Sequence, residues 1–179
     1  MGVNEVTPDG LRAAGLRLFR QRQYAAAAEQ LRAAAAAYAA DSADWCETLN
    51  DLGVVYRLQR NGSAAIAALE DAAAGFARLG DGAGQGVALA NLGDVYAGIK
   101  QQEQAAINYS EASALLAWAG DRERQSRVLW ALSLHHVRRG RWLSAMTLME
   151  QSLSLRPRLG VGGWLLRALL RLALGMWSG

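Results

Sequence analysis

His135 and His136 are the only two histidines of the 179-residue sequence, and they are adjacent. Histidine acts as a general acid or base and as a metal ligand. Two helical histidines can share one metal when they stand four residues apart, because that spacing places them on one face. Adjacent residues point in different directions, so this pair predicts neither a metal site nor a catalytic pair. We expect His136 to lie in the core and His135 to face solvent.

Cys46 is the only cysteine. A single cysteine excludes an intrachain disulfide and a metal site built from several cysteines. It stands near the start of a predicted helix, where the helix dipole could lower the pKa of the thiol. No histidine is close to it in sequence, so the simpler expectation is a buried, unreactive thiol.

Residues 80–86, Gly-Asp-Gly-Ala-Gly-Gln-Gly, are as rich in glycine as a phosphate-binding loop. The segment lacks the Gly-Lys-Ser/Thr ending of such loops and follows a helical pattern rather than a strand. The equivalent segment forty residues later, which starts at Gly120-Asp121, has no further glycines. We interpret residues 80–86 as a flexible turn between repeats, and we expect no enzymatic activity, no cofactor and no metal.

The elements that position these residues are predicted to be helices. Apolar residues make up 52% of the chain and charged residues 20%, and the only prolines are Pro8 and Pro157. Alanine and leucine are strong helix formers, so helix is favoured throughout the long segment between the prolines. The first ten residues lack the basic and apolar stretches of a secretory signal, which predicts a cytoplasmic protein.

An eight-residue pattern recurs with a period of forty residues, starting at Leu49, Leu89, Leu129 and Leu169, and a further copy starts at Leu11. Apolar residues or alanine occupy its first, fourth and eighth places and a small residue its fifth, all on one helical face. A second helical pattern follows each of the first four copies: Ala27, Leu31 and Ala34; Ala65, Leu69 and Ala72; Ala105, Tyr109 and Ala112; Ala145, Met149 and Ser152. The sequence therefore predicts stacked helical hairpins.

These residues resemble the tetratricopeptide repeat. The forty-residue period is similar to that of its longer-period class, which has Asn-Leu-Gly-x-x-Tyr (here residues 91–96) and Gly-Asp signatures. That class includes kinesin-light-chain-like proteins and bacterial regulatory proteins. The resemblance covers about residues 9–177. It implies an all-α, right-handed superhelix of four hairpins within residues 1–158 (about 9–40, 45–79, 85–119 and 125–157), with residues 159–179 as a C-terminal capping helix. The fourth copy departs from the pattern at Ser133 and His136.

In tetratricopeptide proteins the first helices of the hairpins line a concave groove that binds partners. Carried onto this chain, the resemblance implies a groove lined by Arg12, Leu16, Phe19, Arg20, Asn50, Val54, Arg57, Leu58, Ala90, Asp94, Ala97, Gly98, Trp130, Leu134, Val137, Arg138, Leu170, Leu174 and Trp177. A peptide or helix of a protein partner would dock there, with tryptophan and arginine as anchors. The alternative is that some of these side chains only pack against neighbouring repeats. The family's carboxylate clamp is not expected, because Leu16 and Asp51 occupy two of its positions.

Charge is distributed unevenly along the chain. Residues 1–120 contain nine basic and thirteen acidic residues, whereas residues 121–179 contain ten arginines, three acidic residues and four of the six tryptophans. This polarity indicates an acidic partner, an anionic membrane surface or head-to-tail self-association, unless the arginines merely form a solvated face. Without a nucleic-acid-binding motif, no nucleic acid is expected as a partner.

Residues 159–179 form the most apolar part of the chain but include Arg167 and Arg171, which argue against a membrane-spanning helix. The two arginines are four residues apart, as in a basic amphipathic helix. The repeat register predicts that Leu169, Leu172, Ala173 and Met176 form the packing face. The outer face also carries Leu166, Leu170, Leu174 and Trp177, and apolar residues at these places predict that a partner, a second copy or lipid covers that face.

Two functions follow as hypotheses. The first is a non-enzymatic scaffold or adaptor that binds a peptide or helix in its groove. The alternative is an assembly factor held at the periphery of the inner membrane face through the basic, tryptophan-rich C-terminal helix.

Overall fold

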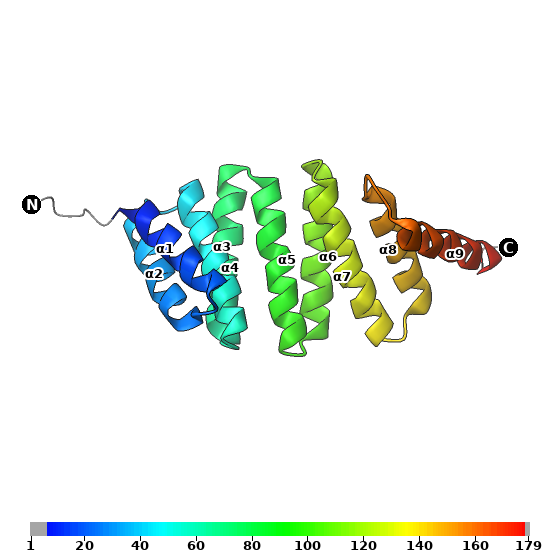
Figure 1. Cartoon of the computed structure of the whole chain (residues 1–179), viewed down its shortest axis with the longest axis horizontal. Coiled ribbons are helices and arrows are strands. Elements are labelled where there is room, and N and C mark those ends of the chain that lie inside the picture. Colours follow the sequence, from blue (N-terminus) through cyan, green and yellow to red (C-terminus); the bar gives the residue numbers. More distant parts are fainter. Residues whose placement is uncertain (1–6, 178–179) are drawn as a thin grey trace, which may run out of the picture.

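The computed structural model describes residues 7–177, and these form a row of helices joined by short turns (Figure 1). The helices are α1 (Pro8–Arg20), α2 (Tyr24–Ala37), α3 (Ala43–Leu58), α4 (Gly62–Leu79), α5 (Gly82–Gly98), α6 (Gln102–Trp118), α7 (Arg122–Arg138), α8 (Trp142–Leu155) and α9 (Val161–Trp177). Successive helices pack as hairpins, and hairpins stack in chain order. The predicted all-α solenoid is confirmed. No helix within residues 7–177 is long and apolar enough to cross a membrane.

The Gly-Asp linkers end one helix and begin the next, as the sequence pattern indicates. Gly80 closes α4 with φ 71°, and Gly120 follows α6 with φ 73°, a left-handed conformation that glycine adopts without steric cost. Asp81 then caps α5 by accepting a hydrogen bond from the Gly84 amide at 2.8 Å. Asp121 caps α7 in the same way, from the Arg124 amide at 2.9 Å. These caps fix where each hairpin meets the next.

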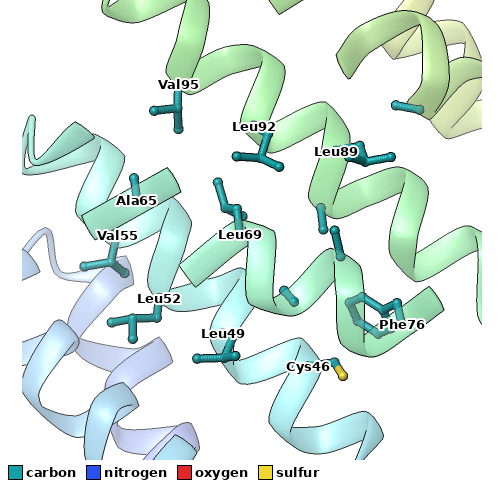
Figure 2. Close-up of a cluster of buried hydrophobic side chains, with 14 of the residues drawn as sticks. Cys46, Leu49, Leu52, Val55, Ala65, Leu69, Phe76, Leu89, Leu92 and Val95 are labelled. Atoms are coloured by element: carbon teal, nitrogen blue, oxygen red, sulfur yellow. The ribbon is translucent and has the colours of Figure 1, made fainter. Parts of the chain in front are cut away.

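The small residue at the fifth place of the pattern lets the two helices of a hairpin approach closely. A Cβ atom on Gly53 of α3 would stand 2.4 Å from Cγ of Leu69 on α4, and one on Gly93 would stand 2.6 Å from the Tyr109 ring on α6. Leu69 has no exposed surface and lies in a core that runs from α3 through α4 to α5 (Figure 2). Close approach at this glycine therefore brings α3 and α4 into direct contact, as does Gly75 of α4, whose Cβ would stand 2.4 Å from Sγ of Cys46.

The glycine-rich segment is not the flexible turn that we expected. Gly82, Gly84 and Gly86 all lie in the first turns of α5, and Gly86 is buried. The turn itself is limited to Gly80 and Asp81. The glycines are explained by packing, because a Cβ on Gly86 would stand 2.9 Å from Cγ of Leu116 on α6.

The prediction for the two histidines was wrong in its assignment of faces. His135 is buried, with 4% of its surface exposed, and His136 is only partly buried. His135 falls at the place of Val55 and Val95 in the preceding repeats, both of which are buried. Its Nε2 atom is buried without a hydrogen-bond partner. Burial, together with the charges of His136 and nearby arginines, lowers the pKa of His135 from its ordinary value of 6.5.

We expect His135→Val to raise the free energy of unfolding by about 1 kcal/mol, because valine fits the register and removes an unsatisfied buried polar atom. Since the folded chain binds this proton less readily than the unfolded chain, His135 makes the wild type lose stability as the pH falls below about 6.5. Between about pH 8 and pH 5, the free energy of unfolding of His135→Val should therefore fall by less than that of the wild type. Urea unfolding of the wild type and the variant at both pH values measures this difference. An equal loss in His135→Val and wild type would contradict the assignment.

Helix α9 is present, but it is rotated relative to the repeat register. Leu169, Leu172 and Met176, expected to form the packing face, are 63%, 66% and 82% exposed, whereas Leu170 is buried with 7% exposed. Within residues 7–177, α9 contacts α8 and does not contact α7, unlike the first helices of the inner hairpins, which contact each other. Hydrogen bonds from Arg167 and Arg171 to Glu150 of α8, at 3.0 and 2.9 Å, hold this orientation.

Candidate functional site

A continuous groove runs along the first helices of the hairpins. It consists of three hollows of about 500, 340 and 330 Å³. Val87 and Arg124 line both the first and the second hollow, and Asp94, Tyr109 and Ala131 line both the first and the third. We call this combined surface the groove. It lies mainly on α1, α3, α5 and α7, with Phe76 of α4, Asp81 of the turn before α5, and Tyr109 and Leu116 of α6.

The amino-terminal end of the groove is acidic. Arg12 of α1 contacts Glu47 at 2.7 Å, Asp51 at 3.2 Å and, more distantly, Asp44 at 3.9 Å, all on α3. One guanidinium thus faces three carboxylates. Burial raises the pKa of Asp51 despite the neighbouring charge of Arg12. Because Arg12 is already paired, this end offers net negative charge to a ligand.

Tyr109 and Asp94 form the floor at the centre of the groove. The Tyr109 hydroxyl donates a hydrogen bond to Oδ1 of Asp94 at 2.7 Å. Burial raises the pKa of Tyr109, and the bond to Asp94 raises it further. Tyr109 takes the place that Leu31 and Leu69 occupy in the first two hairpins, so its ring belongs to the core while its hydroxyl reaches the groove.

The third hollow lies between two arginines. Arg57 of α3 and Arg138 of α7 line it, and neither guanidinium forms a hydrogen bond or ion pair with another residue of the described range 7–177. The Nε atom of Arg57 is nevertheless buried. Between them α5 presents Asp94, Ala97 and Gly98, and a Cβ on Gly98 would meet nothing within 4 Å. The hollow therefore combines open space with one carboxylate, Asp94, and two arginines that form no ion pair within residues 7–177.

Comparison with known proteins identifies the repeats. Residues 46–117 match the family model of the tetratricopeptide repeat, and the hairpins on either side continue the same architecture. The second and third hairpins, α3 to α6, are therefore tetratricopeptide repeats. No curated protein matches its sequence.

Several solved structures share this fold. BtubC (BKLC) from P. vanneervenii is 18% identical, with a TM-score of 0.76 over 89% of this chain and 72% of that chain. Aspartyl phosphate phosphatase F from Bacillus subtilis is 12% identical, with a TM-score of 0.78 over 83% of this chain and 39% of that one. A putative kinesin light chain with nearly identical TPR-like repeats from Podosopora anserina is 16% identical, with a TM-score of 0.72 over 94% and 87%. Identities this low establish the fold alone.

Many residues that the tetratricopeptide resemblance placed in the groove do line it. They come from all four hairpins: Arg12, Asn50, Arg57, Ala90, Asp94, Ala97, Gly98, Leu134 and Arg138. Leu16, Val54 and Val137 are half-buried on the same helices, and Arg20 and Leu58 are exposed near helix ends. Whether any of them binds a partner stays a prediction.

Other predicted groove residues lie elsewhere. Phe19 packs against the core, with its ring centroid 6.1 Å from that of Tyr24. The Trp130 ring is covered by the guanidinium of Arg156, 5.8 Å from its centroid. Leu170 is buried and Leu174 half-buried in α9, which does not contact α7, so neither extends the groove. The side chain of Trp177 lies outside the described part of the structure.

The sequence reasoning missed Tyr109, Asn91, Arg124 and Arg127, which also line the groove. Asn91 donates a hydrogen bond to Asn50 across α3 and α5 at 2.8 Å. Tyr109 had a signal in the sequence, since a tyrosine replaces the leucine of the earlier repeats opposite a new aspartate, Asp94. Cys46 is fully buried, and burial raises the pKa of its thiol, so it has the unreactive character that the simpler interpretation predicted. No cluster of three or more His, Cys, Asp or Glu side chains in the described residues could hold a metal ion.

Proposed function

We propose that this chain is a non-catalytic scaffold that holds a peptide or helix of a partner protein in the groove. Tetratricopeptide repeats generally serve protein interactions, and they are usually not catalytic. The observation that carries the proposal is the pair of unpaired guanidiniums of Arg57 and Arg138 beside an open hollow. Desolvated arginine is a frequent anchor of protein interfaces, and an acidic side chain is its natural counterpart.

The charge of the groove also supports a polarity for the bound segment. Its amino-terminal end presents Glu47 and Asp51 around the already paired Arg12, and its other end presents Arg57 and Arg138. A ligand with basic residues beside Glu47 and Asp51 and acidic residues beside Arg57 and Arg138 matches both ends. Reversed binding would bring like charges together at each end.

The alternative function, attachment to an anionic membrane, depends on the arginines of α9. Arg167 and Arg171 both donate hydrogen bonds to Glu150 on α8. This pairing reduces the positive charge that they offer to lipid headgroups. The groove is therefore the better-supported site.

The test is selection of a displayed random peptide library on the immobilised chain, followed by fluorescence anisotropy of the enriched peptides. We expect Arg57→Glu or Arg138→Glu to raise the dissociation constant at least about tenfold, because the reversed charge repels an acidic anchor. Gly98→Leu should also raise the dissociation constant, because its side chain would occupy the hollow, where an added Cβ meets no atom within 4 Å.

The matched control is Arg32→Glu, the same charge reversal at an exposed residue of α2, a second helix of a hairpin. It should change the dissociation constant less than about twofold. Enriched peptides that bind all three groove variants as tightly as the wild type would overturn the proposal.

A further inference from the structure

The outer face of α9 is a continuous apolar stripe that no other helix within residues 7–177 covers. It consists of Val161, Leu165, Leu169, Leu172 and Met176, which are 79%, 49%, 63%, 66% and 82% exposed. They share one helical face by their spacing, and no charged residue falls among them. An uncharged stripe of this length on a surface helix indicates an interaction site.

The stripe carries the residues that meet another helix in the inner hairpins. Leu169 and Leu172 stand forty residues after Leu129 and Leu132, which are only 6% and 5% exposed. In the hairpin of α7 and α8 that face is covered by neighbouring helices. Because α9 is rotated, the same pattern is turned toward solvent. The pattern of α9 thus suits a helical partner better than a lipid surface.

The spacing of the stripe identifies which helix fits. If two copies of α9 lie antiparallel about an axis between Ala168 and Leu169, Val161 of each copy faces Met176 of the other, and Leu165 faces Leu172. The stripe is thus complementary to itself under a twofold axis, the symmetry of most protein dimers. We propose that the chain forms a homodimer through antiparallel pairing of α9 with α9 of a second copy.

Charge and size agree with this pairing. Arg167 and Arg171 are held by Glu150 on α8, away from the stripe, so no arginines face each other across the axis. Helix α9 extends from the end of the row of hairpins along the long axis of the molecule (Figure 1). Pairing five exposed apolar side chains from each copy removes on the order of 1,000 Å² from water, which a specific interface requires.

The experiment is sedimentation equilibrium of the full chain over a range of concentrations. We expect a mass of twice 19.2 kDa for the wild type. Leu165→Glu alone, or Leu172→Lys alone, should raise the dimer dissociation constant about 100-fold or more, since each buries an unpaired charge. An equimolar mixture of the two variants should recover a dimer, because antiparallel pairing places the introduced carboxylate of one copy opposite the introduced ammonium group of the other.

The matched control is Ile107→Glu, which introduces the same charge at a 59% exposed apolar residue of α6 and should leave the dimer intact. Circular dichroism of every variant checks that the helices remain. A wild type that stays monomeric at all concentrations would overturn the proposal, as would variants that dimerise normally. Binding of a monomeric wild type to phosphatidylglycerol vesicles, lost in Leu165→Glu, would also overturn it and assign the stripe to a membrane surface.

Discussion

Replacing Leu69 with alanine is expected to lower the free energy of unfolding by about 3–4 kcal/mol. Leu69 of α4 has no exposed surface and belongs to the same buried core as Leu52 and Val55 of α3 and Leu92 of α5 (Figure 2). Its removal takes away apolar contact with both neighbouring helices at once. The glycine opposite it, Gly53, has no side chain with which to fill the cavity.

Urea unfolding followed by circular dichroism measures this loss. Leu79→Ala is the matched control, because Leu79 ends the same helix and is 47% exposed. The free energy of unfolding of Leu79→Ala should be less than about 1 kcal/mol below that of the wild type. A similar loss in both variants would show that Leu69 is not the central contact of this hairpin.

The second large effect concerns Gly53→Ala, which we expect to lower the free energy of unfolding by about 2 kcal/mol. On helix propensity alone, alanine in the middle of α3 would stabilise the chain by about 1 kcal/mol. The added Cβ would however stand 2.4 Å from Cγ and 2.8 Å from Cδ2 of Leu69. The two helices must move apart, and such overpacking costs about 1–3 kcal/mol beyond the propensity gain.

Two further variants separate propensity from packing. Gly98→Ala has no atom within 4 Å of its new Cβ and should raise the free energy of unfolding by about 0.5 kcal/mol. In the double variant Gly53→Ala with Leu69→Ala, the new methyl group enters the space that leucine leaves. The double variant should therefore lose less free energy of unfolding than the sum of the losses in the two single variants, by about 1 kcal/mol or more. Additive losses would mean that the two residues do not contact each other.

The hairpins could be predicted from the sequence because the same physical requirement repeats every forty residues. Each first helix needs a small residue where its partner helix approaches, and each linker needs a residue that accepts a left-handed backbone. Gly53 and Gly93 meet the first need, and Gly80 and Gly120 the second. The groove positions on α3, α5 and α7 follow from the same register.

The features that the sequence did not predict depend on contacts between particular side chains. Which of His135 and His136 is buried is decided by one residue of rotation on α7. The hydroxyl of Tyr109 reaches the groove only because Asp94 lies above it, on another helix. The rotation of α9 is linked to Glu150, which attracts two arginines that the repeat register would place elsewhere. Periodicity describes faces of helices and contains no information about such pairings.

Helices α1 to α9 contact only helices one or two places away in the chain, within residues 7–177. A nascent chain can therefore complete each hairpin as soon as it leaves the ribosome, without waiting for a distant segment to be synthesised. The first hairpin gives the second a surface to fold against, and each later hairpin adds to the finished end. Helix α9 emerges after these hairpins, so its apolar stripe becomes available only when the array behind it is already folded.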